Sequence, residues 1–476
     1  MSASIVGRKE EQKILAQALQ AQEAELIAIT GRRRVGKTFL VTSVYHDHFA
    51  FELTGVQNGL LEAQLQNFTD QLTEFAKPKM PIKPPQTWSD AFRLLRDYLQ
   101  TEGLNTRKVL FFDELPWLSG QKSGFLEAFG YFWNSWASRQ NVVIVICGSA
   151  ASWIIQRVVN DRGGLHNRIT KRIDLEPFTL AETDTYLQSN GIFFDKYQIV
   201  QLYMAMGGIP HYLKEIDPAL SAVQNIDKIC FSKKGLLSDE FNRLYPSLFA
   251  NADNHITVVR TLSQKKQGMT RSQISELGKL PNGGGLSKLL EELVQSGFIS
   301  DYFPLGKKKK EKLYRLTDEY SLFYLQFIER HRFQGGNIWQ HLSQTPTYKT
   351  WSGYAFESIC LKHVDRIKQA LGISGIYTFA ASFHKKGTDT EEGAQIDMVF
   401  DRNDHTINLF EIKFYNKPFT ISKDYAEQLR QTLWQFQTET KTLKQVNWIF
   451  ITTFGLVSNA HALGLVAKTL TLEDLF

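Results

Sequence analysis

The first stretch of the chain that could do chemistry is the loop GRRRVGKT at residues 31–38. It fits the pattern G-x-x-x-x-G-K-[ST], follows the apolar run LIAIT at 26–30 and precedes an expected helix. In such a loop, backbone N–H groups surround phosphates, the lysine reaches the β- and γ-phosphates and the hydroxyl holds Mg²⁺. We therefore expect ATP and Mg²⁺ to bind at Gly31, Arg32, Arg33, Arg34, Val35, Gly36, Lys37, Thr38 and Phe39.

Two acids after a second apolar run supply the other half of phosphate chemistry. The run VLFF at 109–112 leads into Asp113 and Glu114, which is the Walker B arrangement. Asp113 would share a Mg²⁺ ion with Thr38, and Glu114 would polarise the water that attacks the γ-phosphate. The second motif makes a chance match of the loop improbable. Together the motifs predict ATP binding and hydrolysis, with Lys37 and Glu114 as catalytic residues.

Three shorter elements match a known family. IVGRKEE at 5–11 resembles the hhGRxxE element that opens AAA+ ATPases of the STAND and origin-recognition type, which implies that Gly7 and Arg8 lie near the adenine. GIP at 208–210 resembles the GxP element, which implies that Pro210 touches the base. Ser149 follows the run VVIVIC at 142–147 and matches the sensor-1 position, where a polar side chain responds to the γ-phosphate.

Arg168 is a candidate arginine finger. A structural arginine is an equal alternative, because a finger that acts on a neighbouring subunit requires a homo-oligomer. Taken together, residues 1–248 resemble the archaeal-type ATPases of the AAA+/STAND group. The resemblance continues through LYRLTD at 313–318 and the aromatic stretch 320–328. Members of this group commonly end in a restriction-endonuclease-like domain, so the resemblance spans nearly the whole chain.

Acids and a lysine recur near the C-terminus in the pattern of a PD-(D/E)XK nuclease. Asp397 lies on one expected strand, and Glu411-x-Lys413 lies on the next, after a turn at 403–405. Strand periodicity places Glu411 and Lys413 on the same face. Asp397 and Glu411 would hold one or two Mg²⁺ or Mn²⁺ ions, and Lys413 would position a water and steady the developing phosphate charge.

Two further residues extend this second centre. Glu357, on the helix that opens the C-terminal domain, would complete the metal shell. Gln428 stands where the nuclease superfamily often places a supporting polar residue. The alternative is that Glu-x-Lys only solvates an exposed strand face, since the pattern is common by chance. Intact acids and lysine permit nuclease activity and do not prove it.

The elements that must position these residues predict an α/β, multidomain chain. Near-continuous apolar strands at 26–30, 109–112 and 142–147 are typical of a parallel sheet covered on both faces. We predict a P-loop AAA+ core, a helical lid, a winged helix-turn-helix and a PD-(D/E)XK domain, with helices at 355–370 and 425–437, strands at 395–400, 407–414 and 447–452 and a final helical stretch. The expected domain bounds are 1–178, 179–250, 251–335 and 345–476.

Charge is concentrated in the predicted winged helix. The chain has 55 Lys+Arg and 49 Asp+Glu, a net charge of +6, whereas residues 255–332 alone carry 14 Lys+Arg and 8 Asp+Glu. The lysines at 307–310 fall at the expected wing tip, where a winged helix meets a phosphate backbone. This favours nucleic acid as the partner, DNA rather than RNA. A solvated lysine run and a protein-contacting winged helix are the alternatives.

Composition excludes several other classes. The 476 residues are 43% hydrophobic and 22% charged, as in ordinary globular proteins, and no apolar run approaches the roughly 20 residues that span a bilayer. The three isolated cysteines exclude a disulfide framework or a zinc cluster and indicate a cytoplasmic protein, and from the lack of a long apolar run we expect no membrane partner.

The sequence therefore predicts an ATP-hydrolysing switch or motor coupled to nucleic-acid binding and to metal-dependent phosphodiester cleavage. The alternative is a regulatory or signalling DNA-binding ATPase whose nuclease-like domain is inactive and only binds.

Overall fold

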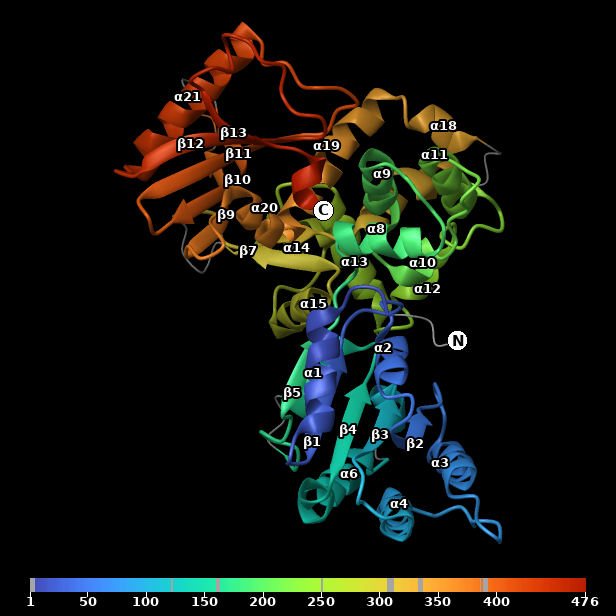
Figure 1. Ribbon diagram of the computed structural model, residues 1–476. Helices are drawn as coiled ribbons and strands as arrows, with labels where there is room; N and C mark the ends of the chain where they lie inside the picture. The colour runs from blue at the N-terminus through green and yellow to red at the C-terminus, as the bar shows by residue number, and fades with distance from the viewer. Residues whose placement is uncertain are drawn as a thin grey trace. The chain divides into compact units, whose positions relative to one another are not determined.

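The chain divides into two compact units in a computed structural model that describes residues 5–120, 123–159, 163–249, 251–305, 312–332, 337–385, 387 and 393–476. Unit 1 is Met1–Pro177 with Gln295–Gly297, and unit 2 is Phe178–Val294 with Phe298–Phe476. In Figure 1 unit 1 runs from blue to teal, and unit 2 runs from green to red.

Unit 1 is built around a five-stranded sheet with the strand order β2-β3-β4-β1-β5. All neighbouring strands are parallel. Every position of β1 and of β4 is buried, because helices cover both faces of the sheet, and apolar side chains fill all of these positions except Glu25 and Thr30 at the ends of β1. The predicted parallel sheet is thus confirmed. Its strands are β1 (Glu25–Thr30), β2 (Phe49–Thr54), β3 (Lys108–Asp113), β4 (Val142–Cys147) and β5 (Lys171–Asp174).

Helices and aromatic side chains form the core beside this sheet. Phe92 contacts the rings of Phe125, Phe129 and Phe132, which brings two helices together over one sheet face. The helices of unit 1 are α1 (Lys9–Gln20), α2 (Lys37–Val44), α3 (Leu61–Ala76), α4 (Trp88–Glu102), α5 (Leu115–Leu118), α6 (Phe125–Ser135), η1 (Ala137–Arg139), α7 (Ala151–Ile154) and η2 (Ile155–Val159).

Unit 2 begins with a helical segment, as the sequence predicts. A capping box at Thr179 starts α8, and Asp195 caps α9. The helices of this segment are α8 (Leu180–Ser189), α9 (Lys196–Met206), α10 (Pro210–Leu213), α11 (Ala222–Ile226), η3 (Asp227–Phe231) and α12 (Glu240–Leu244).

A helical segment with a small antiparallel sheet follows. The sheet has the order β6-β8-β7, and β6 is a strand that the sequence analysis did not predict. The other elements occur in the predicted order of three helices and a hairpin. They are α13 (Ala252–Ser263), β6 (Met269–Thr270), α14 (Arg271–Gly278), α15 (Gly284–Gln295), β7 (Ile299–Tyr302) and β8 (Leu313–Leu316). The lysines at 307–310 lie outside the described residues.

The chain then passes through further helices into a five-stranded mixed sheet. The sheet has the order β13-β12-β11-β10-β9, antiparallel from β9 to β11 and parallel from β11 to β13. These elements are α16 (Glu319–Phe323), η5 (Tyr324–Ile328), α17 (Glu329–His331), α18 (Ile338–Leu342), α19 (Pro346–Lys362), α20 (Val364–Leu371), β9 (Thr378–Lys385), β10 (Ala394–Arg402), β11 (Thr406–Lys413), α21 (Lys423–Thr440), β12 (Gln445–Thr452), β13 (Val466–Leu470) and η6 (Leu472–Leu475).

Two predictions for this region are wrong in detail. The final stretch is the edge strand β13 followed by a short 3-10 turn, not a helix, because residues 466–470 add to the sheet beside β12. The single helix expected at 355–370 begins earlier, at Pro346, and is interrupted at His363. The His363 ring at this interruption is buried, lies 2.8 Å from the carbonyl oxygen of Ile359 through Nδ1 and accepts from the backbone N–H of Leu180 through Nε2.

Candidate nucleotide and metal sites

The phosphate loop follows β1 directly and leads into α2. Gly31 has φ +142°, and a Cβ there would lie 2.3 Å from the carbonyl oxygen of Leu175, so only glycine fits. Lys37 is buried, and its Nζ donates to the carbonyls of Gly31 and Arg32, each at 2.9 Å. The loop therefore curls around the lysine ammonium group, in the strand–loop–helix context that the motif requires.

The predicted Mg²⁺ ligands of unit 1 lie in contact. Thr38 Oγ1 donates to Asp113 Oδ2 at 2.6 Å, although 75 residues separate the two in sequence. The strand order explains this contact, because β4 alone separates β1 from β3 and the carboxyl ends of parallel strands meet at one sheet edge. A hydroxyl and a carboxylate oxygen side by side are hard ligands of the kind that Mg²⁺ prefers.

Glu114 is held in a strained position by Ser149. Its backbone is left-handed, with φ 47°, which is costly for a non-glycine residue and persists only where neighbours hold it. Its carboxylate accepts from Ser149 Oγ at 2.5 Å and from Ser149 N at 3.1 Å, while its own N–H donates to Asp113 Oδ1 at 2.8 Å. The two predicted catalytic residues, one from each of two neighbouring strand ends, thus contact each other.

Of the remaining predicted residues of unit 1, one is buried against the phosphate loop and others are exposed. Arg8 is buried, and its Nη2 lies 3.5 Å from the carbonyl oxygen of Val35, so the element that starts at Gly7 contacts the phosphate loop. Phe39 is exposed. Arg168 is exposed as well, and within the described residues its side chain makes no hydrogen bond or ion pair. Neither the role of Arg168 as a finger nor a structural role is therefore established, and the finger stays a prediction.

Pro210 belongs to unit 2, at the start of α10. The element before it is tightly packed, because a Cβ at Gly208 would lie 2.0 Å from the carbonyl oxygen of Phe178. Phe178 N also donates to the carbonyl of Gly208 at 2.7 Å. The glycine of the GIP element is thus required by packing within unit 2, and contact of Pro210 with a base stays a prediction.

The second predicted centre forms on the inner strands β10 and β11 of the C-terminal sheet. A β-bulge between Ile396 and Val399 interrupts the pairing of β10 with β9, and Asp397 lies within it. Met398 pairs with Phe410, so the next antiparallel pair places Asp397 beside Glu411. Lys413 Nζ lies 2.6 Å from Glu411 Oε1, which confirms that the two side chains share one strand face.

The three acids of this centre carry mutually unfavourable charge. Burial, and then the carboxylate of Asp397, raise the pKa of Glu357 on α19. Burial, and then Glu411, raise the pKa of Asp397. Arg315 and Lys413 oppose both shifts. Carboxylates that repel one another in a partly buried site are stabilised by a cation, because the cation relieves the repulsion.

The donor set fits a divalent ion held in part by its substrate. Within the described residues, no group of three His, Cys, Asp or Glu side chains is arranged to hold a metal. Glu411 contacts Lys413 and the hydroxyl of Tyr425, in both cases through Oε1. Glu357 and Asp397 are the pair that we assign to Mg²⁺, which is commonly held by one or two carboxylates together with water and phosphate oxygens, and the role of Glu411 as a further ligand stays a prediction.

Sequence analysis missed two residues of this centre. Tyr425 on α21 donates its hydroxyl to Glu411, whereas Gln428, one turn further along the helix, is exposed. Burial is the largest single influence on Lys413 and lowers its pKa, but the contributions of Glu411 and Tyr425 together raise the pKa above its usual value, so the lysine stays charged. Arg315 on β8 is the second missed residue. A tyrosine three positions before Gln428 was a visible signal, whereas nothing in the sequence linked Arg315 to these acids.

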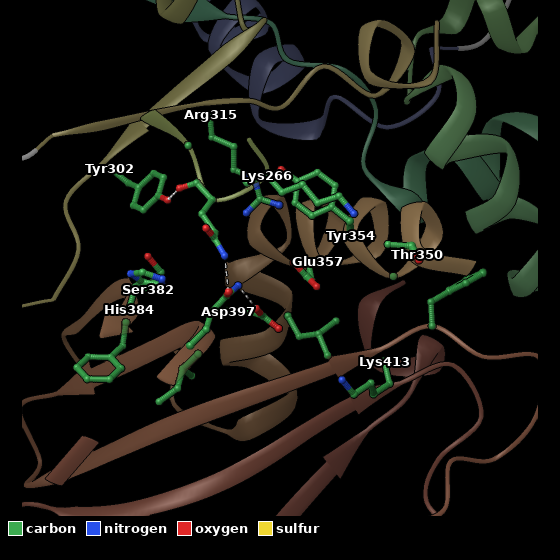
Figure 2. A pocket seen from close by; sticks show the side chains of 18 of the residues that line it. Lys266, Tyr302, Arg315, Thr350, Tyr354, Glu357, Ser382, His384, Asp397 and Lys413 are labelled. Atoms are coloured by element: carbon green, nitrogen blue, oxygen red, sulfur yellow. Dashed lines mark hydrogen bonds between the residues drawn. The ribbon is translucent and has the colours of Figure 1, made fainter. Parts of the chain in front are cut away.

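A cavity of about 2030 Å³ lies over this centre. Figure 2 shows Tyr302, Arg315 and Lys266 on one side of it, Asp397 and Lys413 on the other, and Glu357 between them. The cavity is lined by polar and charged side chains from both the three-stranded segment and the C-terminal sheet.

Comparison with known proteins bears on the N-terminal part of the chain. Residues 5–216 match the family model described as an ATPase domain predominantly from Archaea. An uncharacterized protein of Methanocaldococcus jannaschii is 22% identical over 446 residues, which cover 90% of this chain and 91% of that protein.

Among solved structures, the chain is similar to the Walker-type ATPase of Pyrococcus abyssi. The TM-score is 0.50 and the identity 17%, and the match covers 68% of this chain and 96% of that one. The ORC2 protein of Aeropyrum pernix, in its ADPNP-ADP complexes, matches with a TM-score of 0.41 and 13% identity, over 72% of this chain and 96% of that one, which is too distant to bear on function.

None of the described helices has the length and hydropathy needed to cross a bilayer.

The comparisons agree with the geometry of unit 1. With its parallel sheet, its phosphate loop and the family match over residues 5–216, the N-terminal part of the chain is a P-loop ATPase domain.

Proposed function

We propose that this chain is an ATPase whose second unit binds nucleic acid, DNA in preference to RNA, and cleaves phosphodiester bonds with a divalent metal. The observation that carries the proposal is that Glu357, Asp397 and Lys413 line one cavity, with Glu411 paired to Lys413. These residues come from three separate elements, α19, β10 and β11. If Glu411 and Lys413 only solvated one exposed strand face, acids from two other elements would not be expected beside them.

In unit 1 the proposed roles follow from the contacts. Thr38 and Asp113 would hold Mg²⁺, which supplies Lewis-acid stabilisation of phosphate charge. Lys37 binds the β- and γ-phosphates, and Glu114 accepts a proton from the attacking water. Ser149 orients the Glu114 carboxylate through its two hydrogen bonds, so that the base points in one direction.

In unit 2 one pair of residues is proposed to bind the metal, and a second pair is proposed to stabilise charge on the phosphate. Glu357 and Asp397 would hold a divalent ion that polarises the phosphate. Lys413 stays protonated and lies where it stabilises negative charge on the phosphate, while Glu411 orients Lys413 and is itself oriented by Tyr425. Tyr425 is therefore a positioning residue.

The packing of unit 2 supports coupling between the two activities. Tyr197 on α9 stacks on Phe414 with ring centroids 5.1 Å apart, and Leu180 N donates to His363 Nε2 at 3.0 Å. The helical segment that carries Pro210 is therefore attached to the C-terminal sheet. We propose that nucleotide-dependent movement of this segment carries the nuclease-like centre with it.

The direct test is metal-dependent cleavage by the full chain. Purified protein is incubated with labelled single- and double-stranded DNA and RNA, with and without Mg²⁺ or Mn²⁺. The wild type is compared with Asp397→Asn and with Asp404→Asn, a matched carboxylate that pairs with Arg402 at the hairpin turn. We expect cleavage in the wild type and in Asp404→Asn and its loss in Asp397→Asn. Cleavage that survives Asp397→Asn would contradict the proposed centre.

A second candidate function is favoured by the state of Glu411. Because Lys413 and Tyr425 engage this carboxylate and no three-ligand metal group forms within the described residues, the centre could bind nucleic acid without cleaving it. The chain would then be a DNA-binding regulatory ATPase. Retention of DNA in a gel without metal-dependent cleavage, in every divalent ion tried, would select this alternative.

A further inference from the structure

The cavity of unit 2 has two walls that come from different parts of the chain. One wall is the C-terminal sheet with α19, which carries the acids. The other is formed by residues within 265–273, 302–305 and 313–315, which include β6 and parts of β7 and β8 and belong to the predicted winged helix. A winged helix that docks independently on a duplex would not need to face the acids.

The two walls are bonded to each other close to the acids. Leu305 N donates to the carbonyl of Ser382 at 3.0 Å. Gln267 Nε2 donates to Gln395 Oε1 at 2.6 Å, and Gln395 Nε2 donates to Asp397 Oδ1 at 3.2 Å. Two glutamine side chains thus bridge the distance from the Asp397 carboxylate to the opposite wall.

The opposite wall presents cations to the acids. Arg315 is 8% exposed, and its guanidinium donates to Tyr354 Oη at 3.1 Å and to Ser358 Oγ at 2.8 Å. Lys266 Nζ lies 5.1 Å from the centroid of the Tyr354 ring. With Lys413 below, positive charge lies on both sides of Glu357 and Asp397 (Figure 2). A polyanion between the walls would meet cations on two sides.

Aromatic side chains line the same space. Tyr302 and Tyr415 border the cavity, and Tyr415 is 46% exposed, whereas the ring of Tyr354 is buried beside Arg315. Bases that are free of a duplex stack on such rings, whereas the bases of a duplex are already stacked on one another. Cations that track a backbone, interleaved with tyrosine rings, are the usual combination in sites for single strands.

We propose that this cavity holds a single strand of nucleic acid, with residues 265–273, 302–305 and 313–315 as its second wall, so that the acid centre acts on single strands and single-stranded ends rather than on continuous duplex. The cleavage part of this inference rests on the proposed function, whereas the binding preference does not. A duplex is stiffer and wider than a single strand, so the hydrogen bonds that join the two walls, Leu305–Ser382 and Gln267–Gln395, would hinder the approach of a duplex to Asp397 more than that of a single strand.

The first test compares three forms of one labelled DNA of about 20 nucleotides: the single strand, the blunt duplex and a duplex with a single-stranded tail. Fluorescence anisotropy in Ca²⁺ measures binding, and gel analysis in Mn²⁺ measures cleavage. We expect the full chain to bind the single strand and the tailed duplex at least roughly tenfold more tightly than the blunt duplex, and to cut them within the unpaired region. Equal binding of the blunt duplex would overturn the inference.

A pair of tyrosine variants locates the binding in the cavity. Tyr415→Ala removes an exposed ring that borders the cavity, and Tyr377→Ala removes a more exposed ring, 74% exposed, that does not border it. We expect Tyr415→Ala to weaken single-strand binding roughly tenfold and Tyr377→Ala to leave it unchanged. Equal effects of the two substitutions would place the strand elsewhere and overturn the inference.

A cross-link tests whether the walls must open. The backbone bond between Leu305 and Ser382 brings the two main chains within reach of a disulfide in the double variant Leu305→Cys/Ser382→Cys, and the three native cysteines are buried. We expect the oxidised protein to keep its affinity for the single strand. Loss of that affinity on oxidation, with recovery on reduction, would show that the walls separate and would overturn the inference.

The outcomes separate this inference from the proposed function. Preferential binding of single strands without cleavage in any metal would support the inference and contradict the nuclease activity. Cleavage of the blunt duplex at the rate of the single strand, lost in Asp397→Asn, would support the nuclease activity and overturn the inference.

Discussion

The nucleotide site of unit 1 and the acid centre of unit 2 use similar residues in different ways. Around Asp113 and Glu114, hydroxyl and backbone donors satisfy the carboxylates, and one strand order brings Thr38 and Ser149 to them. Around Asp397 and Glu357, the nearest charged neighbours include other carboxylates, and Arg315 enters from a distant segment.

This difference shows how each site depends on its fold. The first site is assembled by a parallel sheet whose strand ends meet at one edge, so its motifs almost determine its geometry. The second depends on a bulge, on a helix and on the packing of a segment more than 80 residues away from Asp397 in sequence, so the motif alone does not determine it. We expect the first site to tolerate changes in unit 2 and the second to respond to its walls.

The largest expected effect is in unit 1. Lys37→Ala removes a buried ammonium group that the phosphate loop encloses, and we expect ATP binding to weaken roughly a thousandfold, because a buried charge pair loses one partner. Titration calorimetry with ATP measures it. Lys13→Ala, on the exposed face of α1, is the control and should bind ATP normally. Normal ATP binding by Lys37→Ala would contradict the assignment of the nucleotide site in unit 1.

Glu114→Gln should separate binding from turnover. The amide keeps the size of the side chain and an oxygen for Ser149, but it cannot accept a proton, so we expect ATP turnover to fall about a hundredfold or more while ATP remains bound. Phosphate release and nucleotide retention are measured on the same protein. Glu127→Gln, an exposed glutamate on α6, should turn over ATP at the wild-type rate. Ordinary turnover by Glu114→Gln would remove the assigned base.

Lys413→Met should act only on unit 2. It removes the cation beside Glu411, and we expect metal-dependent cleavage to fall about a hundredfold while ATP turnover is unchanged. Cleavage and ATP turnover assays on one preparation test this. The matched control is Lys423→Met, an exposed lysine at the start of α21. A parallel loss of ATP turnover in Lys413→Met would show that the two centres are not chemically separate.

Stability against pH should distinguish the units as well. Burial lowers the pKa of His363 in unit 2 to about 4, so the ring is neutral in the folded chain and takes up a proton on unfolding below its ordinary pKa. Its contribution is present above pH ~6.5 and is lost progressively as the pH falls toward 4, by about 2 kcal/mol between pH 7 and 5. Hydrogen exchange at both pH values should show this loss in unit 2.

His363→Gln is the variant that isolates this effect. Glutamine can accept from Leu180 N but does not titrate, so the part of the pH dependence due to this group should disappear. An unchanged loss of stability in unit 2 between pH 7 and 5 would mean that His363 is not its source. An equal loss of stability in unit 1 of the wild type between pH 7 and 5 would show that the two units do not differ in their pH dependence.

The smallest expected effect concerns Ser149. Ser149→Ala removes the 2.5 Å hydrogen bond to Glu114 but leaves the backbone bond, so we expect ATP turnover to fall about tenfold with little change in ATP affinity. Ser149→Thr restores the hydroxyl and should restore most of the rate. A faster enzyme in Ser149→Ala would mean that Ser149 restrains Glu114 rather than orienting it.

Local patterns predicted most of the fold and most of the first site. The apolar runs at 109–112 and 142–147 became β3 and β4, and the contact of Thr38 with Asp113 follows from motif and strand order together. The hairpin turn between β10 and β11 and the shared face of Glu411 and Lys413 were likewise visible, because turn residues and strand period are local signals.

What the sequence could not predict depends on tertiary contacts. Strand β9 is an edge strand with few buried positions, and β13 adds to the sheet only because β12 is there to pair with it. Tyr425 was passed over in favour of Gln428, because only the angle of α21 on the sheet decides which turn of the helix meets Glu411. In the sequence, Arg315 is only one basic residue on an expected strand. Its place near the acids depends on the packing of β8 against α19, where it donates to Ser358.

The most direct test of two chemically separate centres is a paired assay on one preparation each of the wild type, Glu114→Gln and Asp397→Asn. ATP turnover is measured with Mg²⁺, and cleavage of single-stranded DNA is measured with Mn²⁺ in the absence of ATP. We predict that Glu114→Gln loses turnover and keeps cleavage, and that Asp397→Asn loses cleavage and keeps turnover. Cleavage that persists in Asp397→Asn, or that disappears in Glu114→Gln, would contradict the account.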